Sequence, residues 1–288
     1  MSTGLYSQHL DRPHVAKIRN ILIAVLLIFF GIVVLFPLVY MAAWSFGPAV
    51  EVSSNSYNII PSSWSLDSYR SFFSFSPYSW RWILNSFIVA VCTVVLNVVF
   101  AGMAGYAFSK IDFKGSKALF FIILLGMMIP YQVTQVPLYI LIVNKFKMTN
   151  SYAALILPGC CTAYNIFLAK QFFSGIPTAL IENAKVEGAS QFRIFRSIII
   201  PLSKTILAVM AINTFMATWN TFFWPFLVTS KDYMYTIQVG LKTFKFANGT
   251  LFSPMMAGAV VSSLPMFILF FSLQKYFLEG VTIGAVKG

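Results

Sequence analysis

The chain has 288 residues, of which 58% are hydrophobic, 17% are aromatic and only 10% are charged, and its mean hydropathy is +0.79. One water-soluble core cannot enclose that much apolar surface, so the composition excludes an ordinary soluble domain and indicates a bilayer protein. The formal net charge of +12 would also suit a nucleic-acid-binding chain, and the distribution of basic residues along the chain decides between the two.

Six apolar runs are long enough to cross about 30 Å of hydrocarbon, which takes roughly 20 helical residues. They lie at 21–44, 83–108, 118–142, 151–170, 205–229 and 255–276. Lipid offers no hydrogen-bond partner to the backbone, so these segments form helices, and the ten-residue alternation of a membrane barrel is absent from the sequence. The sequence therefore predicts an all-α polytopic membrane protein with six transmembrane helices.

The first apolar run, from Ile21 to Trp44, follows basic residues but exceeds the about 7 to 15 residues of a signal-peptide core. No small-residue cleavage site ends it, so we expect a retained helix. The predicted regions are an N-terminal tail (1–20), a transmembrane domain (21–277) with a long loop (171–204), and a C-terminal tail (278–288). Trp80 and Trp82, which open the second run, suit the aromatic belt at a membrane surface, and contact with an external protein is the alternative.

The basic residues predict which side of the membrane holds the termini. Six crossings place both termini on one side, and Lys and Arg are enriched in cytoplasmic loops. With the termini in the cytoplasm, thirteen basic residues lie inside and seven lie outside. The sequence therefore predicts cytoplasmic termini, and this bias explains much of the net charge without nucleic acid.

The placement of acidic residues limits how the protein could be energised. All eight carboxylates fall in predicted loops, tails or helix ends: Asp11, Glu51, Asp67, Asp112, Glu182, Glu187, Asp232 and Glu279. Ion-driven carriers usually need an ionisable group near the membrane midplane, so a secondary carrier is disfavoured. No Gly-Lys dipeptide of a phosphate-binding loop occurs. Any energy would come from a partner.

The sequence also lacks the residue groups of an enzyme site. No carboxylate pair and no nucleophile with a base is apparent in the loops, and the three cysteines and two histidines do not occur at metal-ligand spacing. We therefore expect no catalytic residue, no metal site and no cofactor in this chain.

A polar, basic stretch from Ile176 to Pro201 interrupts the apolar sequence. Pro177 suits the first turn of a helix, Gly188 suits a sharp turn at its end, and Ser190 can cap a second helix that Pro201 closes. One face of the second helix would be apolar, formed by Phe192, Phe195, Ile198 and Ile199. The stretch is either an amphipathic loop on the membrane surface or a docking surface for a protein that supplies energy.

The residues of this stretch resemble the cytoplasmic signature of ATP-binding cassette (ABC) importer permeases. That signature is Glu-Ala-Ala, then Gly-Ala four positions on, then a spaced Phe, Ile and Pro. The matching residues here are Glu182, Ala184, Gly188, Ala189, Phe195, Ile198 and Pro201. Asn183 replaces an alanine and Glu187 replaces the commoner aspartate, with similar size or charge.

Three further segments are similar to carbohydrate permeases of the maltose-importer type: Met127–Leu141, Trp219–Val228 and Gln274–Gly288. The resemblance covers nearly the whole chain and implies a type I ABC importer permease in a bacterial cytoplasmic membrane. It also implies four partners: a second homologous permease, two ATPase subunits that bind ATP and Mg, and an extracytoplasmic binding protein that delivers a sugar. A polyol-like solute such as a glycerol phosphodiester is the alternative substrate.

The resemblance also implies which residues contact the ATPases. The coupling residues would be Glu182, Ala184, Glu187, Gly188, Ala189, Phe195 and Pro201. The C-terminal tail would add Gly284, Val286, Lys287 and Gly288.

Polar and aromatic residues inside the apolar runs are candidates for a sugar pathway, because sugars need amides and hydroxyls for their OH groups and aromatic faces for their rings. The candidates are Asn85, Thr93, Asn97, Gln132, Gln135, Asn213, Trp219 and Asn220. The alternative is that they join helices by hydrogen bonds. Prolines could kink the helices around a cavity or be packing features: Pro130, Pro137, Pro158 and Pro225.

Overall fold

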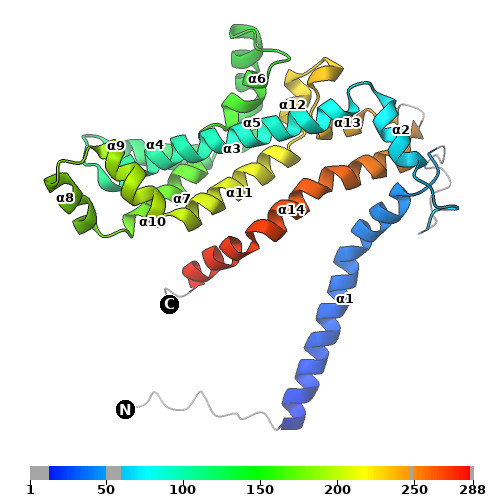
Figure 1. Cartoon of the computed structure of the whole chain (residues 1–288), viewed down its shortest axis with the longest axis horizontal. Coiled ribbons are helices and arrows are strands. Elements are labelled where there is room, and N and C mark those ends of the chain that lie inside the picture. Colours follow the sequence, from blue (N-terminus) through cyan, green and yellow to red (C-terminus); the bar gives the residue numbers. More distant parts are fainter. Residues whose placement is uncertain (1–12, 50–59, 247–248, 286–288) are drawn as a thin grey trace. The chain divides into compact units, whose positions relative to one another are not determined.

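The computed structural model describes residues 13–49, 60–246 and 249–285, and these are almost entirely helical (Figure 1). This confirms the all-α prediction. The strands in this part are β1 (Lys245–Phe246) and β2 (Gly249–Thr250), of two residues each. The chain divides into two compact units, unit 1 (1–71 with 249–260) and unit 2 (72–248 with 261–288).

Three helices of the described residues are long and apolar enough to cross a membrane without a break. They are α1 (Pro13–Ser45), α3 (Ser79–Lys110) and α14 (Phe252–Ala285). α14 continues past residue 278, so the predicted start of the C-terminal tail does not coincide with a helix end. No residue in the spanning window of α1 is buried, so its apolar surface is available to lipid or to another chain.

The other predicted crossings are bent, and up to six spans result only if each bent pair counts as one. α4 (Ser116–Met127) meets α5 (Tyr131–Tyr139) and η2 (Ile140–Lys145) at 99°. α6 (Tyr152–Ile156) and η3 (Leu157–Gly159) meet α7 (Ala163–Ser174) at 42°. The third pair joins at 84° and consists of α9 (Gln191–Ile194), η4 (Phe195–Ile199) and α10 (Ile200–Leu202) with α11 (Lys204–Asn220).

Proline explains most of these breaks. Pro130 precedes α5 and Pro158 lies in η3, so the predicted kinks at these two positions are confirmed. Pro137 lies inside α5 and is followed directly by the π-helical η2. The predicted span 205–229 is not one continuous helix, because α11 ends at Asn220 and α12 (Phe223–Val228) begins a new helix. Pro225 would clash with the carbonyl of the residue four positions earlier in a continuous helix.

The remaining helices of the described residues are short. They are α2 (Asp67–Phe75), α8 (Thr178–Val186), η5 (Asp232–Met234) and α13 (Ile237–Lys242).

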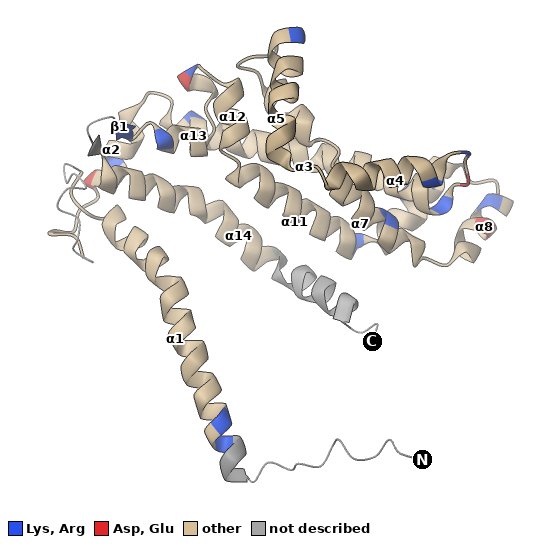
Figure 2. Ribbon diagram, turned by 180° about the vertical axis from the view of Figure 1, so that it is seen from behind, with Lys and Arg blue, Asp and Glu red and all other residues tan. Residues whose placement is uncertain are grey.

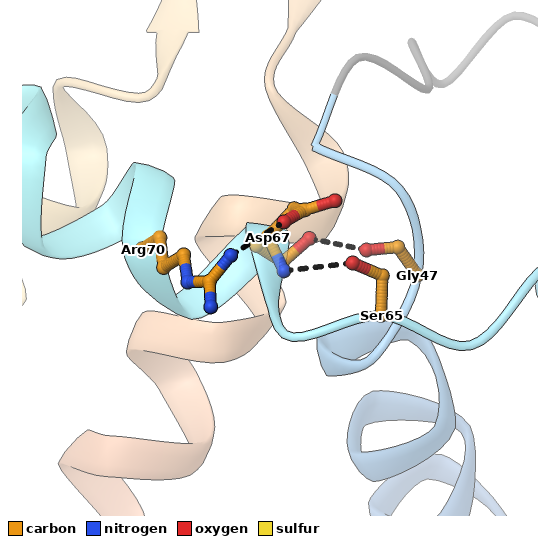
Figure 3. A network of polar contacts seen from close by, with 5 residues as sticks. Gly47, Ser65, Asp67 and Arg70 are labelled. Carbon is orange, nitrogen blue, oxygen red and sulfur yellow. Dashed lines mark hydrogen bonds and ion pairs between the residues drawn. The ribbon is translucent and has the colours of Figure 1, made fainter.

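In unit 1, the segment after α1 is tied to the start of α2 (Figure 3). Ser68 Oγ donates to the Gly47 carbonyl at 2.6 Å, and the Asp67 amide donates to Ser65 Oγ at 3.0 Å. The Arg70–Asp67 ion pair at 3.5 Å has side chains that are 80% and 59% exposed. Such an exposed pair contributes little, so the buried Ser68 bond is the stronger restraint.

The core of unit 2 is built on α3, which packs most extensively against α7 and α11. It approaches α7 closely at Gly105, where an added Cβ would lie 2.5 Å from Ala169 Cβ and 2.8 Å from the Lys170 amide. Apolar side chains gain little by leaving lipid for a helix interface, so helices in a bilayer associate closely through small residues. Gly105 and Ala169 serve this purpose here.

At the other end of α3, Trp82 is completely buried, so its predicted place in the aromatic belt is wrong. Its Nε1 donates to the carbonyl and to Oδ1 of Asp232, each at 3.0 Å. Trp80 is 66% exposed and stacks on Phe73. Gly240 makes room for Trp82, because a Cβ at that position would overlap the indole ring. The burial of Trp82 therefore depends on partners about 150 residues away.

We expect Gly240→Ala to lower the thermal unfolding midpoint of the purified protein, since the added methyl overlaps the buried indole and overpacking typically costs about 1 to 3 kcal/mol. Gly126→Ala in α4 is the control, because nothing lies within 4 Å of its Cβ position. Equal midpoints for the two variants would contradict the described packing of Trp82.

Candidate functional site

The polar stretch 176–201 forms the predicted helix, glycine turn and second helix. α8 ends at Val186, and Gly188 adopts φ +79°, a conformation that favours glycine. Ser190 Oγ then accepts a hydrogen bond from the Arg193 amide at 3.3 Å and caps α9, as predicted. The helical path continues through Pro201 and ends at Leu202.

This loop is attached firmly to the spanning helices of unit 2. Ile181 and Ala184 on α8 are buried in one cluster with residues of α3, α7 and η4. Tyr106 OH donates to Gln191 Oε1 at 2.7 Å, and Lys110 Nζ donates to the Ile176 carbonyl at 2.5 Å. A displacement of α8 would therefore be transmitted to α3 and α7.

The outer surface of the loop is partly apolar. Val186 is 89% exposed and Phe192 is 63% exposed, while Glu182 and Glu187 are also exposed. The predicted apolar stripe is confirmed for Phe195 and Ile199, which are buried, and is wrong for Phe192. Phe192 follows the Ser190 cap by only two residues, so it lies in the first turn of α9. Exposed apolar groups among charged ones are typical of a docking surface.

The other predicted ATPase-contact residues differ in their burial and location. Ala184 is buried in α8, Ala189 is partly buried, and Ala189 N donates to the Ala184 carbonyl at 2.9 Å. Pro201 is exposed in α10. Of the predicted tail residues, Gly284 lies in α14, whereas Val286, Lys287 and Gly288 lie outside the described residues.

A cavity of about 440 Å³ lies among the spanning helices of unit 2. Its lining includes Thr93 and Asn213, two of the predicted pathway residues. The rest of the lining comes from the first two bent pairs, from α11 and from the residues after it as far as α12: Tyr131, Leu155, Pro158, Gly159, Thr162, Tyr164, Asn165, Thr214, Ala217, Thr218, Thr221 and Trp224. Among these described residues none is Asp, Glu, Lys, Arg or His, so the lining combines polar and apolar groups and carries no permanent charge.

Two polar oxygens on the cavity lining are buried without a hydrogen-bond partner in the described part of the chain, Thr93 Oγ1 and Asn165 Oδ1. Leaving such a group unsatisfied costs about 1 to 3 kcal/mol. Both belong to residues that line the cavity, and both oxygens are shielded from it in this conformation.

The Asn165 amide also joins the helices behind the cavity. Its Nδ2 donates to Asn97 Oδ1 at 2.6 Å and to Thr214 Oγ1 at 2.8 Å. Asn97 Nδ2 in turn donates to the Gly159 carbonyl at 2.7 Å. The predicted pathway residue Asn97 is therefore engaged in joining α3, η3 and α7, which is the alternative that the sequence left open.

Several other pathway candidates lie outside the cavity lining. The Asn85 amide donates to the Tyr233 and Tyr235 carbonyls and accepts from Tyr152 OH at 2.6 Å. Trp219 is buried, stacks on Phe215 and donates to the Ser262 carbonyl at 2.9 Å.

Gln135 is buried in α5, and its Oε1 lacks a partner among the described residues. Gln132 and Asn220 are exposed.

Sequence reasoning missed most of the lining. Thr214, Thr218 and Thr221 recur at positions i, i+4 and i+7, a spacing that places them on one helix face and could have identified this wall. Asn165 could have been included with the other amides of the apolar runs. Tyr131 and Tyr164 reach the cavity only because their spans are bent, and no local pattern shows this.

Residues 97–283 match the family model described as the binding-protein-dependent transport system inner membrane component. The chain is 35% identical over 262 residues to an arabinooligosaccharides transport system permease protein of Halalkalibacterium halodurans, covering 90% of this chain and 94% of that protein. It is 34% identical over 205 residues to an sn-glycerol-3-phosphate transport system permease protein of Salmonella typhi, covering 70% and 72%.

Among solved structures, the fold matches a bacterial ABC transporter involved in import of the acidic polysaccharide alginate, with a TM-score of 0.79 at 24% identity over 91% of this chain and 97% of that chain. The loop signature at 182–201, the match to the family model and the fold all indicate an importer permease. The chain belongs to the binding-protein-dependent transport system inner membrane components, the multi-pass permease subunits of ABC importers.

Proposed function

We propose that this chain forms, together with a second homologous permease, the membrane pathway of an ABC importer for an uncharged carbohydrate. An extracytoplasmic binding protein delivers the sugar, and two partner ATPases supply the energy by hydrolysing ATP with Mg. The termini and the loop carrying α8 lie on the cytoplasmic side. The observation that carries the substrate class is the cavity lining, which offers hydroxyls, amides and aromatic rings and no charged side chain.

A sugar matches this lining group by group. Its hydroxyls can exchange hydrogen bonds with the amide of Asn213, and they would donate to the unsatisfied Thr93 Oγ1 and Asn165 Oδ1 once movement of the helices exposes these two oxygens. The rings of Tyr131, Tyr164 and Trp224 offer aromatic surface to the apolar patches of a sugar ring. The lining therefore supports binding by many moderate hydrogen bonds, which lets a substrate pass through rather than remain bound.

An anionic solute is the second candidate, because one relative is named for sn-glycerol 3-phosphate and the matched structure for alginate import. A phosphate or carboxylate in this cavity would lose hydration and find no Lys, Arg or His among the described lining residues. The same lining offers no Asp or Glu for ion coupling, which disfavours a secondary carrier. The uncharged sugar is the better match.

Coupling would run through the firmly attached loop. Val186 and Phe192, with Glu182 and Glu187 nearby, supply the exposed surface that would enter a cleft of the ATPase. Closure of the ATPase pair on ATP would then displace α8, and the buried Ile181 and Ala184 would carry the movement into α3 and α7. Gly284, Val286, Lys287 and Gly288 would add the second ATPase contact.

The substrate class is tested with the importer reconstituted in vesicles together with its binding protein. We expect neutral oligosaccharides, such as arabinooligosaccharides, to stimulate ATP hydrolysis and enter the vesicles, whereas glycerol 3-phosphate and oligogalacturonates do neither. Stimulation by the anionic solutes alone would refute the proposed substrate class and leave the family assignment intact.

Removing one cavity hydroxyl should weaken transport without harming the fold. For Thr93→Val, a near-isosteric change, we expect about a 10-fold lower kcat/KM for sugar uptake, the size of one lost hydrogen bond. Thr134→Val is the matched control, because Thr134 is exposed and outside the cavity and its hydroxyl donates only to the nearby Tyr131 carbonyl. Equal uptake by both variants would exclude Thr93 from the pathway.

The proposed coupling role of the turn is tested by replacing Gly188 with residues that differ in their tolerance of positive φ. A β-branched residue is strained at positive φ, whereas Asn tolerates it, and none of the other described residues lies within 4 Å of the Cβ position. We expect Gly188→Val to reduce substrate-stimulated ATP hydrolysis at least about 10-fold with normal membrane insertion, and Gly188→Asn to keep most of it. Normal coupling in the Val variant would exclude this role.

A further inference from the structure

A second cavity, of about 790 Å³, lies where α3 ends and α4 begins. Three lysines line it: Lys114 and Lys117 from this corner, and Lys170 from α7. Its apolar wall includes Phe108, Phe113 and Phe120. None of these residues lines the sugar cavity or belongs to the loop carrying α8, so the proposed import function does not account for them.

The charge of this cavity favours an anion. Asp112 is its one carboxylate, so the lining carries a net charge of +2 from three lysines and one aspartate. Within the described part of the chain, none of these four side chains forms an ion pair. Lys170 Nζ lies 4.9 Å from the centre of the Phe120 ring, which keeps the ammonium at the cavity wall. Lys110, which is next to this corner, is instead engaged by the Ile176 carbonyl.

The depth of the cavity favours a lipid as the source of that anion. α3 is long enough to cross the membrane and α4 begins a bent apolar pair that would count as one span, so the corner that joins them (Figure 2, Lys and Arg in blue) lies at the level of the headgroups. No residue of α4 is buried, and its outer face continues from the cavity as a row of exposed apolar side chains, Leu119, Ile122 and Leu125. A phosphate held at the corner would place acyl chains along this row. Basic pockets between spanning helices are the usual sites for acidic lipid headgroups.

We propose that this corner binds an anionic phospholipid, with its phosphate among Lys114, Lys117 and Lys170 and an acyl chain along α4. The lipid would bridge the α3–α4 corner to α7, whose C-terminal end leads directly into α8. Bound lipid would therefore stabilise the part of unit 2 that supports the ATPase-facing loop.

The test uses the assembled importer in nanodiscs of equal phosphatidylglycerol and phosphatidylcholine content, followed by native mass spectrometry of the lipids it retains. We expect phosphatidylglycerol to be enriched on the wild type, and its affinity to fall on the order of 100-fold in Lys114→Gln/Lys117→Gln/Lys170→Gln, about 5-fold per lysine. The matched control is Lys145→Gln/Lys147→Gln/Lys231→Gln, which removes the same charge from exposed lysines outside the cavity. The control should retain the lipid.

Three outcomes would overturn the proposal. Equal lipid retention by both triple variants would show that the corner is not the site. Displacement of phosphatidylglycerol by inorganic phosphate would identify a soluble anion as the occupant. Loss of the ATPase subunits from the corner variant, with lipid retained, would identify a protein contact. If the triple variant does not assemble, Lys114→Glu, a single change at an exposed loop position, should still lower retention relative to Lys145→Glu.

Discussion

The hydrogen bonds of Asn165 hold together the three helices on which the rest of unit 2 depends. In a bilayer, apolar side chains gain little by leaving lipid for a helix interface, so close packing and polar bonds must bring helices together. Asn165 binds Asn97 on α3 and Thr214 on α11, while Gly105 lets α3 approach α7. Asn165 is also one of the residues that line the cavity. Helix assembly and the proposed substrate pathway therefore share one residue.

Much of the fold could be predicted because its signals are local. Apolar run length predicted the crossings, and Pro177, Gly188 and Ser190 predicted a helix, turn and capped helix that the structure contains. Pro130 and Pro158 predicted two of the bends. Pro225 indicated a possible kink in the run 205–229, but the position of the break after Asn220 was missed because the run stays apolar across it. Trp82 was misjudged because its partners, Asp232 and Gly240, are distant in sequence.

The candidate site was less predictable, because the sequence shows which side chains are polar and not where they point. Asn85 and Asn213 are both amides in apolar runs, yet the first is engaged by two backbone carbonyls and a tyrosine and the second lines the cavity. The difference arises from η5 and the segment after it, which bring acceptors to Asn85. Only the threonine row on α11 had a local spacing that could have identified the cavity wall.

The 84° angle between the segment Gln191–Leu202 and α11 determines how a displacement of the loop would reach the cavity. A force along the segment 191–202 would act almost perpendicular to α11. It would therefore rotate α11 about the corner instead of moving it along its axis. Asn213 lies ten residues beyond the corner at Ser203, a lever arm of roughly 15 Å. The Ser203 hydroxyl is buried without a partner among the described residues, so no side-chain bond from it stiffens this corner. A displacement of the loop would thus rotate α11 about this corner and move Asn213, which lines the cavity.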